Sequence, residues 1–344
     1  EMKVLKTLER MESYGFQIDR KVHRELKAHY EKIIEQSAEI MRRILGDINV
    51  NSPKQLAHVL YETLKFPINF KTKTGNPSCN EQALMGIFEN RNLDKEQRKA
   101  IEALMNYRSA EKLYSVYIKG IEENGQIAWD DRLHCDYKLF GTKTGRLSCS
   151  EPNLQNIPRD GDIKRMFISS FPNGKIIQLD YSQVELRILA HYSNDKKLIQ
   201  AFREGRDIHR ETTSKCLGIK PEKVTDEQRK VIGKRVNFGI VYQISPPGLA
   251  DKLGCNAKKA KQYIDNWFNE FYRVKEWMRE RREEIIETGR SISFNGRVRR
   301  LYGVDPSTSE GREAIRQGIN SPVQGGAGDI TKASMERLDR AYLK

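Results

Sequence analysis

The sequence KVIGKRVNFGIVY, residues 230–242, predicts a helix with one unusual face. Lys230, Lys234, Phe238 and Tyr242 are spaced by four, so a helix places them on the same side. At a rise of ~1.5 Å per residue the stripe is about 18 Å long, comparable to a nucleoside triphosphate from γ-phosphate to base. Two cations followed by two aromatic rings suit such a ligand. The alternative is an amphipathic helix whose aromatic residues belong to the core.

A second informative stretch is GKIIQLDYSQVELR, residues 174–187. It predicts a short buried strand over 174–180, followed by a helix. An acidic residue between a strand and a helix lies where α/β-type sheets bind ligands and metals. Asp180 is therefore a candidate metal ligand. Ser182 and Glu185 have the spacing of a capping box, which gives Glu185 a purely structural alternative.

Polar residues gather in two irregular segments and on one helix. The sequences TGRLS, residues 144–148, and NLQN, residues 153–156, combine Arg146 with several amides. Amides can address the acceptors of the DNA minor groove, which are similar for every base pair. Arg316, Asn320 and Gln324 repeat the pattern at helical spacing. An ordinary polar loop is the alternative for both segments.

The remaining chain reads as mostly helical. Helical periodicity covers the first ~45 residues, and Ser52 and Pro53 then predict the start of a new helix. A half-buried strand is predicted over 131–139, and a hairpin around Asn295 and Gly296. A last helix is predicted after Gly328.

The composition favours a polyanionic partner. The 344 residues contain 61 Lys and Arg against 47 Asp and Glu, a formal charge of +14 and a pI near 9.4. Neutralising phosphates releases counterions, so nucleic acid is the first expected partner. The chain lacks a run of 18 apolar residues, and its five cysteines form no CxxC pair. We therefore expect a soluble intracellular protein with reduced thiols and no membrane partner.

Four ordered motifs in this sequence resemble those of the family A DNA polymerases, the bacterial DNA polymerase I-like group. They are TGRLS with PNLQNIP (144–158), DYSQVELR (180–187), KxxNFGxxY (234–242) and PVQG (322–325). Fainter likeness at 51–56 and 107–113 extends the resemblance over essentially the whole chain. The resemblance implies an α+β fold of right-hand polymerase architecture, mostly helical, with an antiparallel palm sheet that this chain leaves incomplete. The implied parts are N-terminal helices on the palm (1–45), thumb (46–130), palm (131–190), fingers (191–290) and a return to the palm (291–344).

The resemblance also implies roles for individual residues. Asp180, with the Tyr181 carbonyl, would bind two Mg²⁺ ions, for which Mn²⁺ is a possible substitute, and Lys234 would assist catalysis by neutralising phosphate charge. Glu185 and Tyr242 would exclude ribonucleotides. The residues implied to bind dNTP are Gln183, Glu185, His209, Arg229, Lys230, Lys234, Phe238 and Tyr242. The residues implied to hold primer-template DNA are Arg108, Lys112, Arg146, Asn153, Gln155, Asn156, Arg316, Asn320 and Gln324.

The sequence departs from the family pattern at three points. Lys230 stands where the family usually has arginine, with Arg229 adjacent, and a lysine lacks the bidentate guanidinium fork. Gln243 stands where the family usually has glycine. The family's His-Asp-Glu motif does not occur in the 344 residues. We therefore expect that this chain alone does not polymerise, and that a C-terminal segment or a second polypeptide supplies the motif.

Two other functions compete with DNA synthesis. One is a non-catalytic DNA-binding protein derived from a polymerase. The other is RNA synthesis, which Glu185 disfavours because it resembles the family's deoxyribonucleotide gate. The likeness begins where a polymerase domain begins, so no exonuclease domain is expected here. The expected setting is the cytoplasm of a bacterium or phage-infected cell, with an organellar origin left open, and both replication and repair remain candidate roles.

Overall fold

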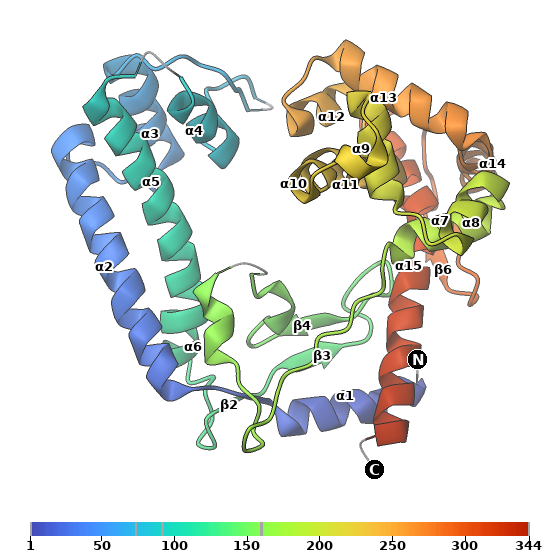
Figure 1. Ribbon diagram of the computed structural model, residues 1–344, viewed down its shortest axis with the longest axis horizontal. Coiled ribbons are helices and arrows are strands. Elements are labelled where there is room, and N and C mark those ends of the chain that lie inside the picture. The colour runs from blue at the N-terminus through green and yellow to red at the C-terminus, as the bar shows by residue number, and fades with distance from the viewer. Residues whose placement is uncertain (1, 73, 91–92, 159–160, 343–344) are drawn as a thin grey trace. The chain divides into compact units, whose positions relative to one another are not determined.

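The computed structural model describes residues 2–72, 74–90, 93–158 and 161–342 (Figure 1). The chain divides into two compact units, each built from separate segments. Unit 1 comprises Glu1–Met11, Tyr137–Ser148 and Gln178–Lys344, and unit 2 comprises Glu12–Asp136 and Cys149–Ile177. The described residues are mostly helical, with small two-stranded sheets. None of the described helices is both long and apolar enough to cross a bilayer.

Unit 2 is organised around two long helices that run side by side, α2 (Arg20–Leu45) and α5 (Lys95–Leu113) (Figure 1). Asp19 caps α2 by accepting hydrogen bonds from the backbone amides of Lys21 and Val22. At one end of the pair, leucines such as Leu60 and Leu104 form a core with no exposure. The other helices of this unit are α3 (Pro53–Ala57), the π-helix η1 (His58–Thr63), α4 (Glu81–Phe88), the π-helix η2 (Tyr114–Ile118), α6 (Lys119–Glu123), and the 3-10 helices η3 (Leu154–Asn156) and η4 (Asp162–Met166).

Two predictions concern the start of α3 and the segment 131–139, which crosses the boundary between the units. Ser52 caps α3 by accepting from the Gln55 amide, and Pro53 is the first helical residue, as predicted. The strand predicted over 131–139 is instead divided in two. Residues Arg132–Leu133 (β2) pair antiparallel with Phe16–Gln17 (β1), whereas Asp136–Lys138 (β3) pair with Ser148–Ser150 (β4). The division arises because the two halves have different partner strands.

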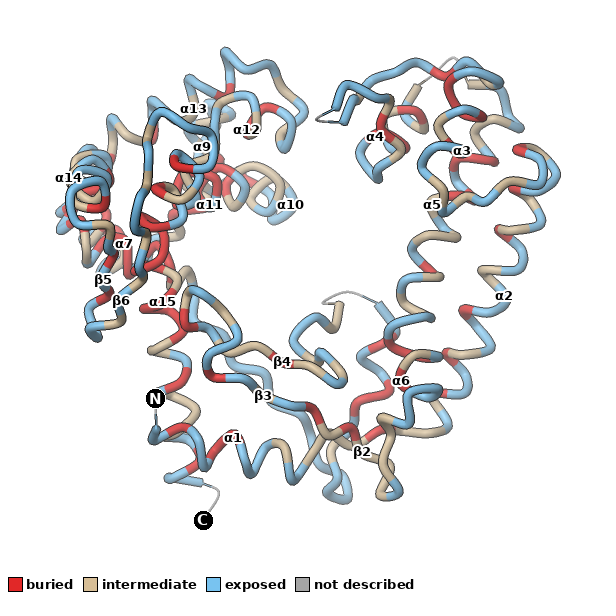
Figure 2. The backbone as a smooth tube through the Cα atoms, turned by 180° about the vertical axis from the view of Figure 1, so that it is seen from behind, coloured by how far each residue is buried: buried red, intermediate tan, exposed pale blue. Residues whose placement is uncertain are grey.

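Unit 1 is a cluster of helices around a continuous apolar core. Figure 2 shows α7 and α11 coloured mainly as buried. Their neighbours bury Trp267, Val274 and Ile315 against them. The helices are α1 (Met2–Tyr14), whose first ten residues belong here, α7 (Val184–Ser193), α8 (Lys196–Arg203), α9 (Ile208–Leu217), the 3-10 helix η5 (Pro221–Lys223), α10 (Asp226–Gln228), the π-helix η6 (Arg229–Gly233), α11 (Lys234–Val241), α12 (Pro246–Leu253), α13 (Ala257–Glu270), α14 (Tyr272–Thr288) and α15 (Ser309–Tyr342).

The hairpin of unit 1 supplies a hydrogen bond that is missing at a proline in the last helix. Strands β5 (Arg290–Ile292) and β6 (Val298–Arg300) form the hairpin predicted around Asn295 and Gly296. Pro322 lies inside α15 and has no amide hydrogen, so the carbonyl four residues earlier loses its helical donor. That carbonyl, of Gly318, accepts a 2.7 Å hydrogen bond from the buried Ser291 hydroxyl. The hairpin thus satisfies the helix at its proline.

The last helix begins earlier than predicted. It starts at Ser309, not after Gly328, and five glycines lie within it, Gly328 among them. Here a glycine allows close packing: a Cβ at Gly326 would overlap the Phe294 ring, and one at Gly328 would press on Arg146. The prediction was wrong because a packing glycine and a helix-breaking glycine look alike in sequence.

Candidate active site

The segment that carries Asp180 is extended but is not a strand. Residues 174–180 were predicted to be a buried strand, whereas the structure leaves all of them exposed, with Ile177 at 81%. No strand among the described residues pairs with this segment. Its backbone groups therefore face solvent, and an extended chain without a neighbour lacks the inter-strand hydrogen bonds that define a strand. The Asp180 carboxylate is accordingly accessible.

The helix that follows Asp180 begins differently from the prediction. Gln183, in a left-handed conformation with φ 55°, precedes α7, and its side chain makes no cap. The predicted capping box of Ser182 and Glu185 is therefore absent. The Glu185 carboxylate, 5% exposed, instead forms an ion pair with Arg146, which lies 39 residues earlier in the chain. The longer-range cation competes successfully with the local cap because it neutralises a buried charge.

Glu185 is also linked to the end of the other motif helix. Burial raises the pKa of Glu185, while Arg146 and a hydrogen bond from Tyr242 oppose the shift. The pKa of Tyr242 is raised as well, first by burial and then by the Glu185 charge. Arg146, Glu185 and Tyr242 thus form one coupled group, and the sequence segments 144–148, 180–187 and 234–242 meet at it.

The predicted stripe of cations and aromatic rings is present. Residues 229–233 form the π-helix η6, and residues 234–241 continue it as α11. Phe238 is 38% exposed and Tyr242 42%, whereas Val236 and Ile240 beside them are buried. Lys230 is exposed and Lys234 is half-buried. The alternative that Phe238 and Tyr242 are core residues is therefore wrong.

Two residues expected to contact triphosphate are engaged within the protein. His209 is 2% exposed, and its ring lies 5.6 Å from the Phe238 ring, centroid to centroid. Burial and the nearby Arg229 lower the pKa of His209 to about 4, so the ring is neutral at pH 7. Arg229 itself donates from Nε to Asp207 Oδ2 at 2.6 Å. In this conformation Lys230 and Lys234 are the more accessible cations of the site.

The expected DNA contacts of unit 1 lie along α15 and the loop before it. The Gly145 carbonyl accepts a 3.0 Å hydrogen bond from Lys332 Nζ, which holds the Arg146 loop on α15. Arg316 pairs with Glu313 of the same helix and stays partly exposed. Asn320 is buried, and its Oδ1 has no hydrogen-bond partner in the part of the chain that the structure describes. Gln324 is half-buried.

The expected DNA contacts of unit 2 line a groove of about 1020 Å³. Arg108, Lys112, Asn153 and Asn156 belong to its lining, whereas Gln155 is exposed outside it. The Arg108 guanidinium donates to two backbone carbonyls, of Cys79 at 2.5 Å and Val50 at 3.2 Å. These bonds hold the Arg108 side chain against the backbone. Of the two cations among these groove residues, Lys112 is therefore the exposed one.

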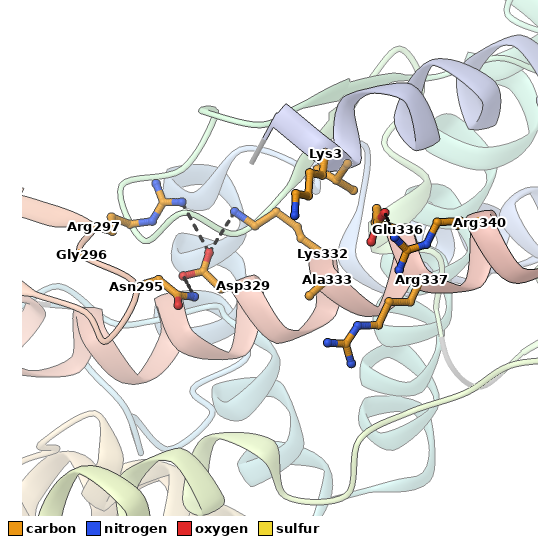
Figure 3. Close-up of a pocket in the computed structure, with 11 residues that line it drawn as sticks. Lys3, Asn295, Gly296, Arg297, Asp329, Lys332, Ala333, Glu336, Arg337 and Arg340 are labelled. Carbon is orange, nitrogen blue, oxygen red and sulfur yellow. Dashed lines mark hydrogen bonds and ion pairs between the residues drawn. The ribbon is translucent and has the colours of Figure 1, made fainter.

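A basic pocket of about 560 Å³ was not anticipated from the sequence (Figure 3). It lies between the start of α1, the β5–β6 hairpin and α15, all in unit 1. Its half-buried carboxylate, Asp329, is within 3.6 Å of Arg297 and 3.2 Å of Lys332, and accepts from Asn295 Nδ2 at 3.1 Å. Two cations already balance this charge, so Asp329 does not offer a free metal ligand. The described residues hold no group of three His, Cys, Asp or Glu side chains suited to a metal.

Comparison with known proteins identifies the family. A family model for DNA polymerase family A matches residues 20–344. The chain belongs to DNA polymerase family A. It is 37% identical to DNA polymerase I of Streptococcus pneumoniae serotype 4, over 98% of this chain and 38% of that protein. It is also 37% identical to DNA polymerase I of Lactococcus lactis subsp. cremoris, over 100% of this chain and 39% of that protein.

A solved structure gives the same assignment for the fold. The POL domain of Pol1 from M. smegmatis, in complex with DNA primer-template and dNTP, has a TM-score of 0.87 and 33% identity to this chain. The match covers 99% of this chain and 59% of that one. The resemblance and the fold class expected from the sequence are therefore confirmed. The chain spans about two fifths of the length of the curated relatives it matches, and the limits of thumb, palm and fingers and the roles of individual residues stay predictions.

Proposed function

We propose that this chain carries the nucleotide-selecting part of a template-directed DNA polymerase, which transfers a nucleotide from dNTP to a primer 3′-hydroxyl. The observation that carries the proposal is the exposed face of η6 and α11. Lys234, Phe238 and Tyr242 present a cation and two rings on one face, beside the buried Glu185. Phosphates, sugar and base require this order of charge and apolar surface. The M. smegmatis relative, whose structure holds primer-template and dNTP, supports this assignment.

In this proposal each residue of the face has a separate task. Lys234 neutralises charge on the triphosphate and can give a proton to the leaving pyrophosphate. Phe238 packs on the deoxyribose. Glu185 and Tyr242, joined by a hydrogen bond and held by Arg146, close the space beside the sugar. A ribose 2′-hydroxyl entering there would displace bonds within a buried, charged group, which penalises ribonucleotides.

Family A polymerases generally use divalent metals, and we propose Mg²⁺, with Mn²⁺ as a substitute, at Asp180 and the Tyr181 carbonyl. Two bound ions would activate the primer hydroxyl and stabilise the leaving pyrophosphate. Mg²⁺ binds through one or two carboxylates together with substrate phosphates and water. The exposed Asp180 fits one of those positions, but no grouped set of further ligands exists among the described residues. Asp180 and the Tyr181 carbonyl therefore fit part of a metal centre, not all of it.

We propose that a segment carrying His-Asp-Glu, either C-terminal to this sequence or in a second polypeptide, completes the centre. The support is the unpaired extended stretch before Asp180. Ile177 and Leu179 expose most of their surface, and the backbone between them has no strand partner in the described chain. Such an edge is suited to pairing with another strand. Pairing there would fix Asp180 beside the incoming carboxylates.

Primer extension tests the proposal directly. The chain is assayed alone and with a His-Asp-Glu hairpin supplied as a C-terminal extension, using labelled primer-template, dNTPs and Mg²⁺. We expect extension only with the added hairpin, its loss in Asp180→Ala, and its retention in Asp251→Ala, which removes an exposed carboxylate on α12. Extension by Asp180→Ala at the wild-type rate would overturn the metal role. Robust extension by the chain alone would overturn the need for the hairpin.

A non-catalytic DNA-binding protein is the second candidate. The groove lined by Lys112, Asn153 and Asn156 favours it, and so does the lack, among the residues that the structure describes, of three grouped His, Cys, Asp or Glu side chains that could hold a metal. It predicts primer-template binding that is unchanged in Asp180→Ala and no incorporation under any condition. Primer extension with the protein that carries the added His-Asp-Glu hairpin therefore separates the two candidates in one experiment.

A further inference from the structure

Behind the proposed nucleotide face, one buried amide joins three helices. Asn237 of α11 has 0% exposure. Its Oδ1 accepts from Trp267 Nε1 of α13 at 2.7 Å and from Thr212 Oγ1 of α9 at 3.1 Å. Its Nδ2 lies 2.9 Å from His209 Nδ1 and 3.4 Å from the Ile208 carbonyl, both on α9. Every polar atom of the amide is therefore used.

The chemistry of these partners fixes the protonation of His209. An indole N–H can only donate, so the atom of Asn237 that faces Trp267 must be the carbonyl oxygen. The NH₂ group then faces His209, and it can only donate. His209 Nδ1 is consequently the acceptor and has no proton, which places the proton of the neutral ring on Nε2. The low pKa of the buried ring agrees with this neutral form.

The same network sets the position of Phe238. Phe238 follows Asn237 directly on α11, and its ring lies on the His209 ring at an interplanar angle of 40°. The packing leaves little freedom, because a Cβ at Gly233 would overlap the His209 carbonyl oxygen. A change in the His209 ring therefore moves the surface on which Phe238 rests. Trp267 donates to the opposite end of the same amide, at Oδ1.

We propose that Asn237 is a positioning residue for the incoming nucleotide. It locks His209 as the Nε2–H tautomer, ties α11 to α9 and α13, and thereby holds Phe238 at the orientation in which it meets the sugar. This role rests on the proposed function. His209 acts in it through Phe238 and through the packing of α9 on α11.

The tautomer is tested by NMR of ¹⁵N-histidine-labelled protein. We expect His209 to be neutral with its proton on Nε2 from pH 5 to 8. In Asn237→Asp the carboxylate can only accept, so the proton should move to Nδ1 and the pKa of His209 should rise. A wild-type His209 that carries its proton on Nδ1, or that is charged at pH 7, would overturn the proposal.

The nucleotide role is tested with a milder variant that keeps the core filled. Trp267→Phe removes the indole N–H, and Trp277→Phe is the matched control, since Trp277 is buried in the same core and stacks on Tyr192. The readouts, both taken on protein that carries the His-Asp-Glu extension with Mg²⁺ present, are the Kd of dTTP on primer-template with a templating adenine and the Kd of the DNA itself. We expect Trp267→Phe to raise the Kd of dTTP about fivefold, the value of one neutral hydrogen bond, with the Kd of DNA unchanged. In Trp277→Phe the Kd of dTTP should stay within about twofold of the wild-type value.

The outcomes separate this inference from the proposed function. Wild-type dTTP affinity in Trp267→Phe, or equal losses in both tryptophan variants, would overturn the role of Asn237 and leave the proposed function standing. Protein that carries the His-Asp-Glu extension and binds DNA but shows no dTTP affinity would overturn the proposed function, and with it the nucleotide role. The NMR result still decides the tautomer in that case.

Discussion

The segments that carry Asp180 and Lys234 differ in how their backbones are satisfied. Residues 229–242 form a helical segment that bonds within itself, and a buried amide fixes it to two neighbouring helices. Residues 174–181 are extended and exposed, with no pairing strand among the described residues. A helix completes its hydrogen bonds locally, whereas a strand depends on a neighbour. The nucleotide face is therefore built by this chain, and the position of Asp180 is left to a partner strand.

The largest expected difference is in protease sensitivity. Trypsin should cut after Lys175 about a thousandfold faster than after Arg235, because cleavage within α11 requires local unfolding that costs roughly 4 kcal/mol. Timed digestion followed by mass spectrometry gives both rates. Addition of the His-Asp-Glu hairpin should slow only the first cut. Equal rates at the two positions would show that the stretch before Asp180 is as well protected as α11.

Gly233→Ala should destabilise the helical segment formed by η6 and α11. Alanine is favoured over glycine in a helix, but its Cβ would overlap the His209 carbonyl oxygen, which belongs to backbone that cannot easily move. We expect a loss of about 3 kcal/mol in the free energy of unfolding, measured with denaturant. Gly248→Ala is the control, since its Cβ would meet only the side chains of Ile244 and Ser245. Its effect should stay within about 1 kcal/mol.

The buried His209 should also make stability depend on pH. Its pKa is about 4 in the folded protein, below the ordinary value of 6.5, so the unfolded chain binds more protons between these values. The free energy of unfolding should therefore rise from pH 4 to pH 6.5, by at most about 3 kcal/mol. His209→Gln should remove this rise, and His58→Gln, at an exposed position, should keep it. An identical slope in all three proteins would show that folding does not lower the pKa of His209.

The smallest expected effect is at Gln243, where the family usually has glycine. Its φ of 51° lies in the left-handed region, and its Nε2 is buried with no hydrogen-bond partner in the described ranges. Gln243→Gly should stabilise the protein by about 1 kcal/mol, because the relieved strain exceeds the added entropy of the unfolded chain. Gln228→Gly, in α10, should destabilise by a similar amount. Thermal unfolding of both variants measures the contrast in sign.

The sequence predicted the features that depend on nearby residues. The stripe of Lys230, Lys234, Phe238 and Tyr242 follows from the helical period, and the hairpin follows from the turn preference of Asn295 and Gly296. The same spacing could not show whether the face with Phe238 and Tyr242 is buried or exposed. That depends on the opposite face, where Val236 and Ile240 pack into the core.

The errors concern partners that are distant in sequence. The strand before Asp180 was predicted from its apolar composition, although a strand also needs a pairing neighbour. The capping box at Glu185 was wrong because Arg146 competes for the same carboxylate. Asn237 was missed as a positioning residue because its partners, Thr212 and Trp267, lie 25 and 30 residues away. No local pattern marks a residue of this kind.

The contact between α1 and α15 has a consequence for the time course of synthesis. Thr7 Oγ1 donates to Asp339 Oδ2 at 2.9 Å across 332 positions of sequence, and Val4 and Leu8 are buried in the same place. At about 5–20 residues per second, roughly 20–70 s separate the emergence of the two helices from the ribosome. During that interval the apolar face of α1 has no cover from α15. A helix made early is thus among the last to be buried.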